Sequence, residues 1–288
     1  MSAKFGPAGN SDAFSAVHKS SLAAPQWIAE QGLDCYEYQC GKGVHVGEDT
    51  ARRVGENARK HGISLSLHAP YFINLANPDP DSLQKTIGYI TSACLVASQM
   101  GASRVVIHSG ALMKRTRREA LDTALRSLRE VIRTCDGQGF GHIALCPETM
   151  GKINQLGDLE EVLELCTLDE RLIPCIDFGH LYARSLGAED GAEAFARMLD
   201  RVEAALGPER ASRFHSHFSR IEFTPGGGEK CHRTFDDDDG YGPDWAPLAR
   251  AIARRGWSPT FICESAGTQA KDALTMKRIY QEVLTAQG

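Results

Sequence analysis

The stretch RVVIHSGALMKRTRREALDTALRSLREVIRTCDGQGFGHIALCPET, residues 104–149, contains the pattern that decides the fold. It starts with a short β-branched run at 104–110, continues with a helical pattern near 116–134 and returns to an apolar run at 142–149. Strands that alternate with helices in this way are typical of units in which a helix connects two parallel strands. The stretch therefore predicts a parallel β-sheet covered by helices.

The same alternation extends along the whole chain of 288 residues. Short apolar or β-branched runs that predict strands lie at 4–6, 36–39, 63–70, 104–110, 142–149, 172–180, 213–219 and 260–265. Helical patterns lie near 48–61, 81–100, 116–134, 158–167, 191–206, 244–255 and 270–285. The run at 213–219 is followed by a stretch that we expect to be a long irregular loop before its helix begins.

Eight strand–helix units in about 250–290 residues fit a (β/α)8 TIM barrel of the α/β class. No linker or low-complexity segment divides the chain, so we predict a single domain over residues 1–288. The alternative is a doubly wound open sheet, but no glycine-rich phosphate-binding turn follows the first strand.

Composition sets bounds on location and partners. The formal net charge of −5 argues mildly against a nucleic-acid binder, because such proteins are usually basic. Nine cysteines without a CxxC pair indicate reduced thiols in a cytoplasmic protein. The N-terminus has no apolar signal core, and no apolar run approaches the roughly 20 residues that span a bilayer. We expect a cytoplasmic monomer with no membrane segment and no protein partner.

Six consecutive predicted strands end in an imidazole or a carboxylate. These residues are His68, His108, Glu148, Asp177, His217 and Glu264. The carboxyl ends of the strands of a barrel meet at one face, where active sites lie. Three histidines and three carboxylates suit zinc or manganese, and carboxylates so close together need cations between them to stay ionised. The sequence therefore predicts a site for more than one metal ion.

Each of these residues alone has a more ordinary interpretation, such as a loop hydrogen bond for a histidine or a helix cap for Asp177. Their coincidence on six strands favours the metal site. His215 lies on the same predicted strand as His217, and we expect its side chain to point to the opposite face and pack between strand and helix.

Several short motifs resemble those of the endonuclease IV family of abasic-site DNA endonucleases, which share a barrel with xylose-isomerase-like enzymes. The motifs are HAPYFINL (68–75), IHSG (107–110), PETMG (147–151), DFGH (177–180), SHF (216–218) and CES (263–265). The resemblance covers nearly the whole chain. It implies a metal-dependent hydrolase of base excision repair, which uses three zinc ions to cleave the DNA phosphodiester 5′ to an abasic site.

The resemblance also implies a role for each matching residue. His68 and His108 resemble the ligands of one metal, Glu148 the carboxylate that bridges two metals, Asp177, His217 and Glu264 the ligands of the second metal, and His180 and His232 those of the third. Tyr71 and Asn74 are the expected DNA contacts, and a lid over the barrel mouth is the alternative role for Tyr71.

The third site departs from the family, which has an aspartate two residues before its last histidine. This chain has Lys230-Cys231-His232 at that place. Our hypothesis is a centre of two zinc ions in which Lys230 acts with Glu148 in catalysis and supplies the positive charge of the third metal. A weaker alternative is that Glu229 turns inward and restores the site. Manganese or iron would also suit these nitrogen and oxygen ligands.

Three functions follow. The first is cleavage of DNA that contains abasic sites, for which the basic run KRTRR (114–118) offers phosphate contacts. The second is a sugar or sugar-phosphate isomerase or epimerase on the same metal-binding barrel. The third is a catalytically silent protein that binds metal or nucleic acid.

Overall fold

Eight parallel strands form one sheet in the computed structural model, which describes residues 2–287. In chain order the strands are β1 (Lys4–Pro7), β2 (Cys35–Gln39), β3 (Ser64–His68), β4 (Arg104–His108), β5 (Ala144–Glu148), β6 (Cys175–Asp177), β7 (His215–Phe218) and β10 (Thr260–Cys263). They lie in the order β1-β10-β7-β6-β5-β4-β3-β2. The first and last strands of this order, β1 and β2, meet through a parallel bridge between Ala8 and Glu37. The sheet therefore closes, and the predicted (β/α)8 barrel is confirmed.

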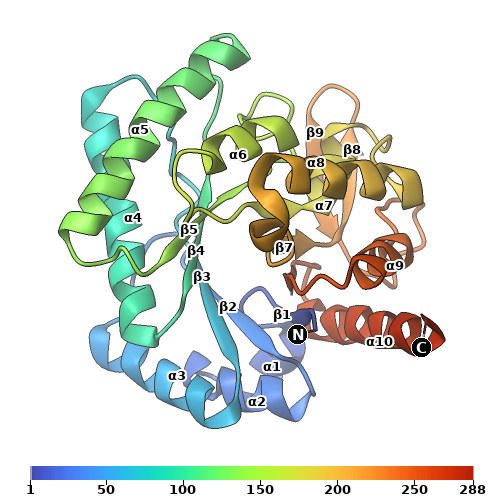
Figure 1. Ribbon diagram of the computed structural model, residues 1–288. Helices are drawn as coiled ribbons and strands as arrows, with labels where there is room; N and C mark the ends of the chain where they lie inside the picture. Colours follow the sequence, from blue (N-terminus) through green and yellow to red (C-terminus); the bar gives the residue numbers. More distant parts are fainter. Residues whose placement is uncertain (1, 288) are drawn as a thin grey trace.

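Helices surround the strands on the outside of the barrel (Figure 1). They are α1 (Asp12–Val17), α2 (Ala24–Glu30), α3 (Glu48–His61), α4 (Pro80–Met100), α5 (Arg117–Gly137), α6 (Leu159–Cys166), α7 (Phe178–Arg184), α8 (Gly191–Ala211), α9 (Trp245–Arg255) and α10 (Gln269–Gln287), with the 3-10 turn η1 (Ser21–Ala23) before α2. No helix among residues 2–287 is both long enough and apolar enough to cross a membrane.

Capping residues fix where the helices begin, and so fix the length of the loops above the strand ends. The Thr116 hydroxyl accepts from the backbone of Glu119, whose carboxylate accepts from Thr116 in return, at the start of α5. Asp158 and Glu161 form the same reciprocal box at α6. Such boxes satisfy amides that lack a partner in the first turn of a helix.

The region between β7 and α9 is not the irregular loop that we predicted. It contains an antiparallel hairpin of β8 (Arg220–Thr224) and β9 (Gly228–Arg233), which stands at the mouth of the barrel (Figure 1). The hairpin is irregular, because Glu222 pairs with Cys231 while Phe223 pairs with Glu229. One extra residue, Lys230, thus lies between two paired residues of β9, which is a β-bulge.

Candidate metal centre

The structure brings the six predicted strand-end residues together at one end of the barrel. His68, His108, Glu148, Asp177 and His217 lie at or near the carboxyl ends of their strands, and Glu264 directly follows β10. In-register pairing sets two pairs of these residues side by side, His108 beside Glu148 and Asp177 beside His217. The convergence expected from the barrel is therefore present.

Glu148 lies at the centre of this group and is buried. Its Oε2 atom is 3.3 Å from Nε2 of His68 and 3.3 Å from Nε2 of His108. Its Oε1 atom is 2.9 Å from Nδ1 of His217 and 3.5 Å from Nδ1 of His180. The two oxygens of one carboxylate thus face two different sets of imidazoles, as a carboxylate that bridges two cations would.

The contacts of Nδ1 in His68 and His108 indicate whether Nε2, which faces Glu148, carries a proton or a lone pair. Nδ1 of His68 lies 2.7 Å from the carbonyl oxygen of Ala69, and Nδ1 of His108 lies 3.2 Å from that of Tyr71. A carbonyl only accepts, so each Nδ1 carries the proton and each neutral ring presents the lone pair of Nε2 to the carboxylate. With neutral rings two acceptors face each other in both pairs, and either a proton or a metal ion between them removes the conflict. The donor set therefore fits a metal ion.

Asp177 supplies a second observation of the same kind. Its Oδ1 atom caps α7 by accepting from the backbone of His180 at 2.8 Å. Its Oδ2 atom is buried and forms no hydrogen bond among residues 2–287, because Nδ1 of His180, 3.2 Å away, lies closer to the carbonyl oxygen of Thr149 at 2.8 Å. A buried acceptor without a partner is costly, and a cation beside it would satisfy it. Ligand atoms of Glu148, Asp177, His217 and Glu264 all lie within 4.8 Å of one another, which is close enough to share an ion.

Burial and mutual charge shift the titration of this group. Without a metal ion the histidines can take up protons: burial opposes ionisation of Glu148, but the charge of protonated His217 and hydrogen bonds from His108, His217 and His68 hold the pKa of Glu148 well below its usual range. Burial raises the pKa of Asp177 to about 6, against the influence of His180 and with that of Glu264. Burial lowers the pKa of His180, but Asp177 and Glu229 outweigh it and raise the pKa to about 9. The cluster therefore attracts positive charge.

A third group of potential ligands lies beside the first two. Ligand atoms of His180, His232 and Glu264 lie within 4.8 Å of one another. Nε2 of His180 is 3.5 Å from a carboxylate oxygen of Glu229. His180 comes from α7, whereas His232 and Glu229 come from β9. Glu229 thus places a carboxylate beside His180, as the weaker alternative for this motif expected.

Lys230 does not lie where we expected it. Its side chain is 55% exposed and forms an ion pair with Glu222, outside the pocket. The reason is the bulge in β9. Residues two apart share a face of a regular strand, but one extra residue moves that relation to residues three apart. Glu229 and His232 therefore share the inner face, and Lys230 does not lie where it could supply the charge of the third metal.

The centre opens into a pocket of about 460 Å³. Its walls are His68, Tyr71, His108, Glu148, Met150, Lys152, Gln155, His180, Glu229, His232 and Glu264. Tyr71 is 52% exposed at the rim, and its ring stacks on His108 with 5.6 Å between the centroids. Tyr71 is therefore available to a substrate, whether as a contact or as a lid.

Two other expected contacts are occupied by the protein itself. The Oδ1 atom of Asn74 accepts from the backbone of Ala76 and Ala111 at 3.1 Å each, and Asn74 does not line the pocket. In the run 114–118, Arg117 pairs with Glu161, and Arg118 pairs with Asp122 and Glu164. These side chains support the loops rather than present free charge.

The prediction for His215 is wrong. Residues 215 and 217 are two apart on β7, so they share a face, and the imidazole of His215 is buried inside the barrel. Its Nε2 atom lies 2.8 Å from Oε2 of Glu37, whose Oε1 lies 2.8 Å from Nε2 of His217. Sequence analysis missed Glu37. The signal for it was a carboxylate within the otherwise apolar and aromatic strand CYEYQ.

Relatives of known sequence place the chain near the endonucleases. Over 256 residues the chain is 30% identical to the uncharacterized protein MJ0133 of Methanocaldococcus jannaschii, a match that covers 89% of this chain and 90% of that protein. Over 178 residues it is 29% identical to a probable endonuclease 4 of Thermoplasma acidophilum, a match that covers 61% of this chain and 59% of that relative. The resemblance to endonuclease IV seen in the motifs is thus confirmed as a similarity.

Solved structures show the same fold in enzymes of different kinds. A D-tagatose 3-epimerase-like protein superimposes with a TM-score of 0.73 at 19% identity over 99% of both chains. Endonuclease IV from Thermus thermophilus superimposes with a TM-score of 0.63 at 18% identity over 93% of this chain and 95% of that one. The family model for the xylose isomerase-like TIM barrel matches residues 25–282, and the chain belongs to that family.

Proposed function

We propose that this protein is a metal-dependent phosphodiesterase that cleaves DNA 5′ to abasic sites, as in base excision repair. The observation that carries the proposal is the position of Glu148 between separate sets of imidazoles. A proton-transfer enzyme with one metal needs only the set around Asp177, His217 and Glu264. His68 and His108 on the other side of Glu148 provide for a second ion, and a multinuclear centre suits phosphodiester hydrolysis.

Three sets of side chains would hold the metal ions. The first is His68, His108 and Glu148, the second is Glu148, Asp177, His217 and Glu264, and the third is His180, His232 and Glu264, with Glu229 beside His180 as a further carboxylate. Zinc fits the mixture of imidazoles and carboxylates, and manganese or iron would fit it as well. When bound, such ions stabilise charge on phosphate oxygens and lower the pKa of a water nucleophile.

The residues of the chain contribute position and charge. Glu148 stays ionised because its pKa is held low, so both its oxygens remain available. Tyr71 covers the rim on the side of His108 and limits the access of bulk water. In the reaction an oxygen of water forms a bond to phosphorus, and the bond from phosphorus to the 3′ oxygen of the preceding nucleotide breaks. That oxygen takes a proton and leaves as a hydroxyl group.

Lys152 is the residue that we assign to the substrate phosphate. It is exposed at the wall of the pocket, on the loop after β5, and it is the single lysine or arginine among the lining residues. Among residues 2–287 it has no carboxylate partner within ion-pair distance. An ammonium group binds a phosphate oxygen as a point charge. Lys152 therefore takes the role that sequence analysis gave to Lys230.

The test is incision of a duplex oligonucleotide that carries one abasic-site analogue. We expect cleavage 5′ to the lesion, loss of cleavage in chelator, and recovery with zinc or manganese. An undamaged duplex of the same sequence is the control. A protein with its full metal content that leaves the lesion strand intact under all of these conditions would contradict the proposal.

Isomerisation or epimerisation of a sugar or sugar phosphate is the second candidate. Its specific support is the small number of free cations around the mouth, where Arg117 and Arg118 are neutralised by carboxylates. A DNA backbone needs several such contacts, whereas a sugar phosphate needs one. Exchange of substrate hydrogen with deuterium from the solvent, measured on ketohexoses and their phosphates, would identify this activity. A silent binding protein would retain lesion DNA without either reaction.

A further inference from the structure

A polar network lies inside the barrel beneath the pocket, in a place where apolar side chains are usual. Glu37 of β2 is fully buried, and so are His215 and His217 of β7. The two strands are not neighbours in the sheet, since β1 and β10 separate them at the point of closure. The contact therefore crosses the interior of the barrel.

Each oxygen of Glu37 has a defined partner. Oε1 lies 2.8 Å from Nε2 of His217 and also accepts from Nε2 of Gln39 at 3.2 Å. Oε2 lies 2.8 Å from Nε2 of His215 and accepts from the hydroxyl of Ser66 at 2.9 Å. A buried carboxylate is tolerated only when it is paired and hydrogen-bonded in this way.

The network determines what His217 presents to the pocket. Glu37 accepts at Nε2, so the proton of the neutral ring is on Nε2 and the lone pair of Nδ1 is directed away from Glu37. Nδ1 lies 2.9 Å from Oε1 of Glu148 and 3.5 Å from a carboxylate oxygen of Glu264. With the proton on Nδ1 instead, the ring would lose its lone pair on the side of the metal centre.

His215 completes the support from the other side. Its Nε2 atom faces Glu37, and its Nδ1 atom lies 3.4 Å from a guanidinium nitrogen of Arg104. Arg104 can only donate, so it favours the lone pair on Nδ1 and the proton on Nε2 of His215. Arg104 thus orients His215, and His215 fixes the second oxygen of Glu37.

We propose that Glu37 is a positioning residue that, held by His215, fixes the tautomer and ring orientation in which Nδ1 of His217 faces the metal centre. The proposal rests on the metal centre of the proposed function but serves hydrolysis and epimerisation equally. Carboxylates that accept from the second nitrogen of a ligand histidine typically contribute about 10–100-fold to metal affinity or to activity.

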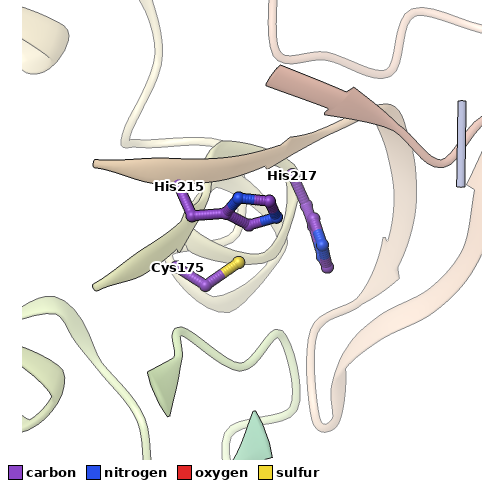
Figure 2. A group of neighbouring side chains, drawn as sticks. All are labelled: Cys175, His215 and His217. Atoms are coloured by element: carbon purple, nitrogen blue, oxygen red, sulfur yellow. The ribbon is translucent and has the colours of Figure 1, made fainter. Parts of the chain in front are cut away.

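Figure 2 shows a competing arrangement, in which the sulfur of Cys175 and the imidazoles of His215 and His217 point into the same space. Ligand atoms of these three buried residues lie within 4.8 Å of one another. Nε2 of either imidazole could bind a metal ion there only by giving up the proton that its bond to Glu37 requires. The 2.8 Å distances to both oxygens of Glu37 therefore favour the positioning network.

The first measurement is the tautomer of His217 in the unmodified protein, from long-range proton–nitrogen NMR correlations of the imidazoles. We expect Nε2 to carry the proton. A ring protonated on Nδ1 would overturn the proposal without any variant.

The second measurement compares Glu37→Gln with Ser66→Ala. The amide of Glu37→Gln has one accepting oxygen for two imidazoles, so we expect mixed tautomers and a loss of metal affinity of about 10–100-fold in chelator competition. Ser66→Ala leaves both imidazole contacts in place, so its affinity should stay within about threefold of that of the unmodified protein, because Oε2 of Glu37 keeps His215 as a partner. Unchanged affinity and tautomer in Glu37→Gln would show that Glu37 only fills space.

Cys175→Ala separates the competing arrangement. We expect its metal content to equal that of the unmodified protein, whereas loss of one metal equivalent would establish the buried site and overturn the positioning role. All three readouts are independent of DNA cleavage. A protein that incises no DNA but shows the expected tautomer and affinities would refute the proposed function and leave this inference standing.

Discussion

Glu229 and Lys230 are adjacent in the chain but have opposite surroundings. Glu229 lies on the pocket side, 3.5 Å from His180, and Lys230 pairs with Glu222 on the outside. A carboxylate can bind a cation, whereas an ammonium group at the same place would repel it. The third group of ligands therefore depends on which of the two residues turns inward.

Replacement of Glu229 tests this assignment. We expect Glu229→Gln to lower the metal content by up to one equivalent and to slow incision at least about tenfold, because an uncharged amide is a poor ligand. Lys230→Ala is the matched control, and its metal content and rate should equal those of the unmodified protein. Elemental analysis and single-turnover incision measure both. A large loss in Lys230→Ala alone would restore the role that the motif gave to Lys230.

Lys152 makes a separate prediction at the same scale. Lys152→Ala should raise KM for lesion DNA several-fold and leave the metal content unchanged, because the ammonium group contacts substrate and no ligand. The dependence of binding on salt should weaken by about one phosphate contact. Lys42→Ala, which changes a lysine of the loop after β2 outside this pocket, is the control. Equal KM values for the two variants would remove Lys152 from the substrate site.

At the scale of elements, the β8–β9 hairpin completes the pocket that the barrel strands begin. It carries Glu229 and His232 over the mouth, and the bulge at Lys230 directs both side chains to the same face of β9. Gly151 on the loop after β5 allows a close approach, since an added Cβ there would lie 2.7 Å from Cβ of Glu229 and 2.9 Å from Cδ2 of His180. The hairpin and the loop are thus fitted to each other.

The bulge can be tested by deletion. Removing Lys230 leaves Glu229 and His232 two apart in a regular strand, so they still share a face, and we expect metal content and incision within about threefold of the unmodified protein. Removing Lys230 together with Cys231 makes the two ligands adjacent and turns one of them outward. That variant should lose the third group of ligands. If both deletions lost metal content and incision equally, the length of the hairpin would matter rather than the face to which Glu229 and His232 point.

At the scale of the whole molecule, the barrel holds an acidic and imidazole-rich centre that favours cations. Asp177, with its pKa raised to about 6, and Glu148 are both buried, and Oδ2 of Asp177 lacks a hydrogen-bond partner among residues 2–287. Burying such groups costs stability unless a counter-charge is present. Metal binding should therefore stabilise the fold.

Chelation tests this coupling. An ion present at roughly 1,000 times its Kd stabilises the folded state by about 4 kcal/mol, which for a chain of this size corresponds to roughly 10 °C in Tm. We expect chelator to lower Tm by this order and added zinc to restore it, as measured by calorimetry. His18→Ala, outside the centre and stacked on Phe14, is the control and should show the same metal-dependent shift. A Tm that does not respond to chelator would mean that the centre is stable without cations.

The sequence by itself determined the barrel and most of the strand-end residues. Both follow from local patterns: alternation of strands and helices sets the topology, and parallel strands bring their carboxyl ends together whatever the loops do. Residues such as His108 and Glu148 become neighbours through regular pairing alone. Their chemistry could therefore be read without coordinates.

Only the tertiary structure decided which of Glu229 and Lys230 faces the pocket, and only it joined Glu37 to His215 and His217. Which of Glu229 and Lys230 faces the pocket depends on a bulge. A bulge forms only when two strands pair, and it reverses the face to which each following side chain points. The contact of Glu37 with His215 and His217 depends on closure of the barrel, which brings together residues 178 and 180 positions apart. Local periodicity contains neither, because both arise from pairing between segments that are separate in the chain.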